Sequence, residues 1–277
     1  MSELLPPGLH IVATPIGNLG DLSPRAADAL RAADRILVED TRVTGKLLHH
    51  IGAKVPMSRY DDHSSDEERQ GIVAMLGTKA IALVSDAGTP LISDPGYKLV
   101  RAARVAGHSV HTIPGPSAAI AALTLAGLPT DRFLFLGFLP AKAKARADAI
   151  ADIAAVRATL VFYESGPRLA DTLAALEEGL GPREAAVARE ISKLHEECVT
   201  GMLRQLAERY ADAPPKGEIV IVVAPPGEAA TASDDDLDTA LDEALTRLSP
   251  SRAAAEVAEQ LNIPRKRAYA RALERSK

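Results

Sequence analysis

The sequence predicts an α/β protein made of two αβ domains and a small helical C-terminal tail. Three observations predict this class. In the first half of the chain, short apolar segments alternate with segments of helical spacing, as in a largely parallel sheet covered by helices. In the second half the apolar segments follow one another more closely, which favours a mixed or antiparallel sheet. The final segment changes from acidic to basic and contains two further helical patterns.

The first half contains five expected strands, each short, aliphatic or phenylalanine-rich, and bounded by glycine, proline or aspartate. They are residues 9–13, 35–38, 80–85, 110–113 and 133–138. The helices expected between them are residues 24–32, 44–51, 66–76, 97–106 and 117–126. Ser23 and Ser65 stand directly before two of these helices, where a serine side chain accepts hydrogen bonds from free backbone N–H groups.

A helix rich in lysine and alanine, residues 141–156, interrupts the pattern after residue 138, and we place a domain boundary there. The expected domains are an N-terminal αβ domain, 1–138, and a C-terminal αβ domain, 139–226. The second domain has expected strands at 159–163, 185–189, 196–200 and 218–223, and helices at 168–178 and 202–210.

The rest of the chain divides by charge. Residues 227–248 form an acidic linker or helix, in which residues 228–243 contain seven acidic side chains and no basic one. Residues 249–277 form a basic helical tail, with seven lysines and arginines against three glutamates. Two short helices, 251–261 and 264–275, fit this tail, and a helix–turn–helix arrangement is one reading of them.

Composition limits the function. The 277 residues are 47% hydrophobic and have a net charge of −5, which argues against a protein that coats nucleic acid non-specifically. Cys198 is the sole cysteine, so the chain forms no internal disulfide, in agreement with a reducing compartment. The N-terminus lacks the pattern of a signal peptide, and the longest apolar run, 118–128, is shorter than the roughly 18 residues of a membrane span. We therefore expect a cytoplasmic protein without a membrane partner.

Several common sites are absent from the sequence. Neither G-x-G-x-x-G after a strand nor G-x-x-x-x-G-K-[ST] occurs, and there is no G-x-S-x-G motif. Residues 195–198, with sequence HEEC, lack the second histidine that a helical metal motif requires, and we expect no metal.

Four polar loops instead follow expected strands, at the ends where open α/β sheets bind ligands. The first, residues 13–21, contains two glycines and a proline, and the second, 39–42, has two acids and an arginine. The third, 85–96, has the sequence SDAGTPLISDPG and is longer than a simple connection of about 2–6 residues. The fourth, 114–119, begins a helix whose free N–H groups suit a polar ligand. A tight turn or a capped helix start explains the first and fourth equally well.

Five segments together resemble the tetrapyrrole-methylase-type (class III) methyltransferases. They are residues 12–21, 39–42, 85–96, 114–118 and 162–165. Within that superfamily, the similarity is greatest to the branch that methylates the ribose 2′-oxygen of a cytidine in 16S rRNA. The resemblance covers about residues 8–223, and the basic tail resembles the C-terminal extension of that branch less specifically. It implies an S-adenosylmethionine cleft between two αβ domains, a homodimer, and 16S rRNA, within the small ribosomal subunit, as the partner.

The resemblance implies the pocket residues, whereas the catalytic and RNA-contacting candidates follow from the position and charge of side chains in the sequence. A base or acceptor near the ribose hydroxyl accelerates such a transfer typically by about 10²–10⁴-fold. Our catalytic candidates are Glu39 and Asp40, with Arg42 pairing a carboxylate or a phosphate. The resemblance implies a cofactor pocket lined by Pro15, Gly88, Thr89, Ile92, Ser117, Ala118 and Phe162. It also implies that Asp86 either holds the third loop or touches the cofactor. The RNA-contacting candidates are Arg265, Lys266, Arg267, Arg271 and Arg275, with Lys142, Lys144 and Arg146.

Two other functions remain open from the sequence. The pocket loops are shared across the superfamily, so a methyltransferase acting on a small tetrapyrrole-like substrate is the first alternative. A non-catalytic nucleic-acid-binding protein that uses the tail is the second, although such a protein needs no long α/β region with four ligand-type loops.

Overall fold

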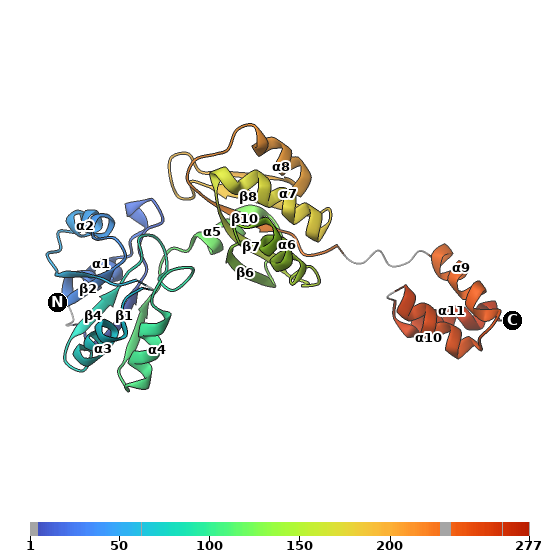
Figure 1. Cartoon of the computed structure of the whole chain (residues 1–277), viewed down its shortest axis with the longest axis horizontal. Coiled ribbons are helices and arrows are strands. Elements are labelled where there is room, and N and C mark those ends of the chain that lie inside the picture. Colours follow the sequence, from blue (N-terminus) through green and yellow to red (C-terminus); the bar gives the residue numbers. More distant parts are fainter. Residues whose placement is uncertain (1–4, 62, 228–233, 262, 277) are drawn as a thin grey trace. The chain divides into compact units, whose positions relative to one another are not determined.

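The computed structural model describes residues 5–61, 63–227, 234–261 and 263–276. The chain divides into two compact units, Met1–Ala224 and Pro225–Lys277, and each is described by itself (Figure 1). Within the described residues, the larger unit contains two five-stranded sheets, and its fold is the α/β class predicted from the sequence. No described helix has the length and apolarity needed to cross a membrane.

The first sheet is parallel throughout, as the alternation of strands and helices predicts. Its strands lie in the order β3 (Met57–Arg59), β2 (Arg35–Val38), β4 (Ala80–Leu83), β1 (Gly8–Val12) and β5 (Val110–Ile113). Helices α1 (Pro24–Ala32) and α2 (Thr41–His50) pack on one face, and α3 (Asp66–Met75) and α4 (Tyr97–Val105) pack on the other.

This layering follows from the sequences of the central strands β2 and β4, which are apolar at successive positions. In β2, Ile36 and Val38 face the core of α1 and α2, whereas Leu37 faces the core of α3 and α4. Two predicted caps are confirmed: the Ser23 and Ser65 side chains each accept a hydrogen bond from a backbone N–H in the first turn of the following helix. A third expected cap, Ser117, begins the helix 118–126 without a side-chain hydrogen bond.

The second sheet is mixed, again as predicted. Its strands lie in the order β6 (Phe133–Phe138), β7 (Thr159–Ser165), β10 (Glu218–Val223), β8 (Glu184–Arg189) and β9 (Glu197–Met202), with only the β6–β7 pair parallel. Helix α5 (Ala118–Ala126) covers one face, and α6 (Ala143–Ala151), α7 (Leu169–Leu180) and α8 (Leu203–Ala211) cover the other. Two short 3₁₀ helices complete this unit, η1 (Leu19–Asp21) and η2 (Gly166–Arg168).

The second sheet begins earlier in the chain than we expected. The range 1–138 includes β6, which pairs with β7, and α5, whose Ala122 and Leu123 pack against the second sheet. The reason is that α5 is apolar almost all round and requires a sheet face to bury its side chains. Strand β3 was not predicted, because its sequence, MSR, lacks an apolar pattern.

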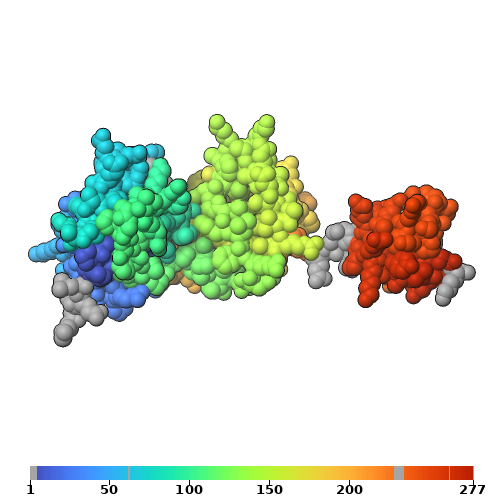
Figure 2. Space-filling view, turned by 90° about the horizontal axis from the view of Figure 1, so that it is seen from below, coloured from blue at the N-terminus to red at the C-terminus, as the bar shows by residue number. Residues whose placement is uncertain are grey.

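The smaller unit contains three described helices, α9 (Asp234–Leu245), α10 (Pro250–Gln260) and α11 (Arg265–Arg275), which enclose one apolar core. Figure 2 shows them, in orange to red, packed into one compact body. The acidic segment expected as a linker or helix is therefore largely helical, because Leu237, Leu241 and Ala244 supply part of this core. Residues 228–233 of that segment lie outside the described residues.

Candidate functional site

The four loops singled out in the sequence lie at one edge of the first sheet. They follow β1, β2, β4 and β5, and the carboxyl ends of parallel strands share an edge. Backbone hydrogen bonds join two of these loops directly. The N–H of Thr14 donates to the carbonyl of Gly88 at 2.8 Å, and the N–H of Gly88 donates back at 3.1 Å. The Thr89 hydroxyl then donates to the carbonyl of Pro116 at 3.0 Å, which connects the third loop to the fourth.

These loops enclose one side of a cavity of about 250 Å³, and the second sheet and the β8–β9 loop supply the other side. The lining residues are Ile16, Glu39, Asp86, Ala87, Gly88, Thr89, Ile92, Ser93, Asp94, Ser117, Ala118, Phe138, Tyr163, Glu190, Ile191, Lys193, Glu218, Ile219 and Val220.

Most of the expected pocket residues line this cavity. Those that do are Asp86, Gly88, Thr89, Ile92, Ser117 and Ala118. Pro15 and Phe162 are not among the lining residues, although a chain neighbour of each, Ile16 and Tyr163, is. Phe162 is fully buried in the core between β7 and helices α6–α8. Because side chains alternate along a strand, Tyr163 points to the opposite face, toward α5 and the cavity.

The three expected catalytic residues separate in the structure. Glu39 lines the cavity, whereas Asp40 and Arg42 do not. Asp40 caps α2 by accepting the N–H of Arg42, and its carboxylate pairs with the Arg42 guanidinium at 2.5–3.1 Å. This hydrogen bonding lowers the pKa of Asp40 to about 2. The Asp40 N–H donates to the Asp86 carboxylate at 3.1 Å, so this turn also positions the third loop.

Asp94 is a cavity residue that the sequence analysis did not select, although it lies in the third loop. Burial raises the pKa of its carboxyl from 3.8 to about 6, with nearby Glu39 and Asp86 acting in the same direction. Leu91 and Ser93, just before it, adopt left-handed backbone conformations with φ of 74° and 63°. Such conformations are costly for non-glycine residues and concentrate at functional sites. No sequence signal distinguishes Asp94 from Asp86, since both stand in the same glycine- and proline-rich loop.

The β8–β9 loop supplies Glu190, Ile191 and Lys193, which sequence reasoning also missed. It lies against the first loop: the Ser192 hydroxyl bonds to the Asp21 carboxylate, and a Cβ at Gly17 would overlap the Lys193 side chain. Lys193 in turn pairs with Glu190 at 2.9 Å. Close backbone approach therefore explains the glycine at position 17, where φ is +141°.

The cavity is strongly acidic. Of the described residues that line it, five are carboxylates and one, Lys193, is a cation. Burial also raises the pKa of Asp86. Since Lys193 is paired with Glu190, the net charge of the lining favours a positively charged ligand.

The expected RNA-contacting residues are mostly on the surface of the smaller unit. Arg265 and Lys266 are exposed at the start of α11. Arg267 and Arg271 pair with Asp234 and Asp238 of α9. Arg275 likewise pairs with α9, and Lys142, Lys144 and Arg146 lie at or within the start of α6 in the larger unit.

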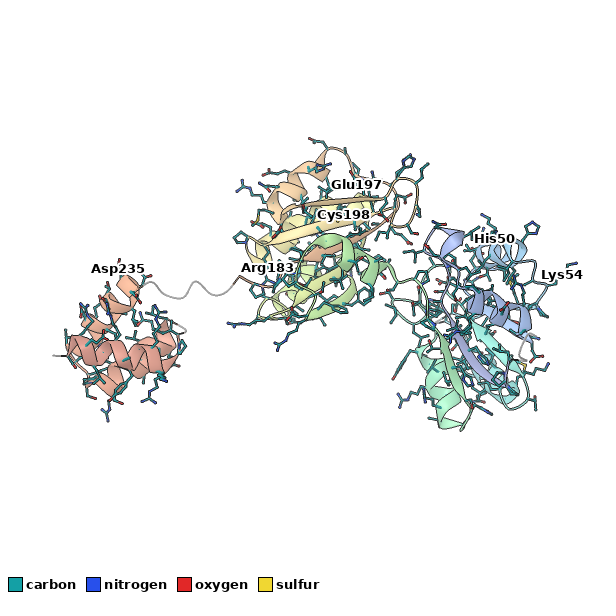
Figure 3. All side chains as sticks on the ribbon, turned by 180° about the vertical axis from the view of Figure 1, so that it is seen from behind. His50, Lys54, Arg183, Glu197, Cys198 and Asp235 are labelled. Atoms are coloured by element: carbon teal, nitrogen blue, oxygen red, sulfur yellow. The ribbon has the colours of Figure 1, made fainter. Side chains whose placement is uncertain are left out.

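The segment 195–198 forms no metal cluster. Glu197 and Cys198 lie on the edge strand β9 (Figure 3), and Glu197 pairs with Arg189 at 2.5 Å. Among the described residues, no group of three or more histidine, cysteine, aspartate or glutamate side chains is arranged to hold a metal ion.

Known proteins and protein families resemble this chain both in sequence and in fold. The sequence pattern of the family "Tetrapyrrole (Corrin/Porphyrin) Methylases" matches residues 8–207, and that of the "RsmI C-terminal HTH domain" matches residues 231–276. The protein called ribosomal RNA small subunit methyltransferase I in Erythrobacter litoralis is 58% identical over 273 residues, which cover 99% of this chain and 97% of that protein.

Two solved structures show the same fold at low sequence identity. A diphthine synthase aligns with a TM-score of 0.62 at 16% identity, over 78% of this chain and 89% of its own. A uroporphyrin-III C-methyltransferase from Thermus thermophilus, complexed with S-adenyl homocysteine, aligns with a TM-score of 0.54 at 19% identity, over 78% of this chain and 97% of its own. The chain therefore belongs to the tetrapyrrole (corrin/porphyrin) methylase family and, within it, to the ribosomal RNA small subunit methyltransferases I.

Proposed function

We propose that this protein transfers a methyl group from S-adenosylmethionine to the ribose 2′-oxygen of a cytidine in 16S rRNA, with the small ribosomal subunit as its partner. The name of its 58% identical relative supports rRNA as the substrate. The product-like ligand of the uroporphyrin-III C-methyltransferase supports the donor. The single observation that carries the proposal is that four loops of the first sheet converge on one acidic cavity.

The residues of the cavity fit this donor. S-adenosylmethionine supplies a methyl group on a positively charged sulfonium, and a lining with five carboxylates and one paired lysine favours a cation. Gly88 allows close approach: its φ is +83°, and a Cβ there would lie 3.3 Å from Ile16. We propose that Gly88, Thr89, Ser117 and Ala118 hold the donor through backbone groups and small side chains.

We propose that two carboxylates of the cavity lining, Glu39 and Asp94, act on the ribose hydroxyl. A general base works best when its pKa is near the working pH, which favours Asp94, at about 6, over Asp40, at about 2. We propose that the Asp94 carboxylate accepts the hydroxyl proton while the oxygen bonds to the methyl carbon, the sulfur–methyl bond of the donor breaks, and S-adenosylhomocysteine leaves. Glu39 orients the hydroxyl. Asp40 and Arg42 then have a positioning role, because they fix the start of α2 beside Glu39.

The test is methyl transfer from labelled S-adenosylmethionine to small ribosomal subunits and to 16S rRNA, followed by mapping of the modified ribose. We expect label at one cytidine 2′-oxygen. The Asp94→Asn variant should lose about 10²–10⁴-fold in turnover while it still binds the donor in calorimetry. Label in a porphyrin precursor but not in rRNA would instead establish the tetrapyrrole-type alternative, and absence of donor binding would refute the proposal.

We also propose that the enzyme is a homodimer, as the resemblance implies. Helix α5 contains one polar residue, Thr124, yet Ile120 and Leu125 remain 49% and 36% exposed. Light scattering on the purified protein should give twice the mass of one chain. The cytoplasmic location stays a prediction.

A further inference from the structure

The smaller unit contains a ladder of ion pairs between α9 and α11. Three aspartates at every fourth position of α9 face three arginines at every fourth position of α11. Residues spaced by four lie on one side of a helix, so the ladder occupies a single flank of α11. The pairs are Asp234–Arg267, Asp238–Arg271 and Asp242–Arg275.

The ladder changes which basic residues are available to a partner. Arg271 contacts both oxygens of Asp238, at 2.7 and 2.8 Å, and a third nitrogen contacts Glu274 at 3.0 Å. These contacts raise the pKa of the Arg271 guanidinium and lower that of the Asp238 carboxyl. The guanidinium nitrogens of Arg271 already contact two carboxylates, whose negative charges offset its positive charge, so Arg271 attracts a phosphate only weakly. The ladder arginines therefore hold the helices together.

The opposite flank of α11 has a different character. Ala268 and Ala272 are buried in the helical core, which separates the two flanks. On the flank away from the ladder, Tyr269 and Leu273 are one turn apart and are 41% and 42% exposed. The two exposed cations at the start of the helix, Arg265 and Lys266, continue this flank.

This combination matches unpaired RNA. Aromatic side chains stack on bases that are not held in a duplex, and neighbouring cations contact the phosphates. The only acid of α11, Glu274, pairs with Arg271. The flank therefore presents two cations and an aromatic ring without an opposing carboxylate from its own helix.

We propose that Arg265, Lys266, Tyr269 and Leu273 form the RNA-contacting surface of the smaller unit, with Tyr269 stacking on an unpaired base. The proposal rests on the proposed function, in which rRNA is the substrate, and it names the surface of the smaller unit that binds this RNA. Among our initial RNA contacts in the smaller unit, it replaces the three ladder arginines, Arg267, Arg271 and Arg275, with Tyr269 and Leu273.

The test uses the full-length protein and a short fluorescein-labelled unpaired RNA. Tyr269→Ala should weaken binding by about 5- to 100-fold, whereas Tyr269→Phe, which keeps the ring, should bind like the unchanged protein. Lys266→Ala should reduce the slope of log affinity against log salt by about 0.7. Tyr97→Ala is the matched control, because Tyr97 is an exposed tyrosine (64%) on α4 of the larger unit.

Circular dichroism is the folding control for each variant. We expect unchanged helix content, because the altered side chains are exposed. Unchanged RNA affinity in both Tyr269→Ala and Lys266→Ala would overturn the inference and leave the flank to a protein partner. The outcome is separable from the proposed reaction. If these variants bind normally while the unchanged enzyme methylates 16S rRNA, the surface is wrong and the function stands. If the enzyme transfers no methyl group to rRNA, the function itself fails.

Discussion

Replacing the buried carboxylate of Glu164 by an amide should destabilise the larger unit strongly. The Glu164 side chain is fully buried, and its oxygens accept the Ser165 N–H at 2.7 Å and the Thr172 hydroxyl at 2.7 Å. Arg168 lies 3.3 Å away and also donates to the carbonyl of Leu139 at 2.7 Å. The carboxylate thus connects the end of β7 to α7 and, through Arg168, to the segment after β6.

The magnitude follows from these contacts. Breaking a buried ion pair costs about 3–5 kcal/mol, and a hydrogen bond to a charged group contributes about 1.5–3 kcal/mol. Arg168 is 31% exposed and keeps its bond to Leu139, so part of its charge stays solvated. In Glu164→Gln, the new NH₂ group also lies against a hydrogen-bond donor, either the Ser165 N–H or the Thr172 hydroxyl, so one of these bonds is lost. We expect a loss of about 2–4 kcal/mol in the free energy of unfolding.

The assay is urea unfolding followed by tyrosine fluorescence. The chain has no tryptophan, and of its five tyrosines only Tyr269 lies in the smaller unit. Glu208→Gln is the matched control: Glu208 pairs with Arg204 at 3.1 Å, but the two side chains are 66% and 77% exposed. Such a pair contributes about 0.3–0.5 kcal/mol. Equal shifts in the two variants would refute the reasoning that burial makes Glu164 important.

Three further predictions concern the cavity and the tail. Because the pKa of Asp94 is raised to about 6 in the folded protein, the protonated carboxyl stabilises the fold at low pH, and this contribution is lost as pH rises from about 4 to 6. Asp94→Asn should therefore unfold at a higher temperature than the unchanged protein above pH 6 and at the same temperature below pH 4; a constant difference would contradict this. Gly88→Ala should lower affinity for S-adenosylmethionine in calorimetry, whereas Gly52→Ala, with a similar positive φ but open space around it, should lower only stability, by about 1–2 kcal/mol. Asp238→Ala, which removes the shared partner of two ladder arginines, should lower the melting temperature of the smaller unit without changing donor affinity.

Elements with strong local patterns could be predicted from the sequence. Four strands have the predicted ends, residues 35–38, 110–113, 133–138 and 218–223. The first two are bounded on both sides by a polar residue or a proline. The convergence of the four loops was also predictable. The alternation of strands and helices indicates a parallel sheet, and the carboxyl ends of parallel strands lie at one edge, so loops that follow those strands come together.

Features that depend on tertiary contacts were not predictable. The sequence does not show which face of β7 carries Phe162, because the strand is apolar on both faces. Strand β6 follows the first sheet in the chain but pairs with β7, and its own sequence does not show which sheet it joins. Glu190 and Ser192 have φ of 50° and 66°, conformations that side-chain type does not predict, and these shape the loop that holds Lys193.

The acidity of the cavity has a consequence for how such an enzyme binds RNA. A lining of five carboxylates and one paired lysine attracts a sulfonium but repels the phosphates of a polyanion. The net charge of −5 adds no general attraction. Under the proposed function, affinity for rRNA therefore comes from a surface outside the cavity, where cations are not already matched by carboxylates. The flank of α11 with Arg265, Lys266 and Tyr269 meets that condition, whereas the ladder flank does not, because each of its arginines is paired with an aspartate.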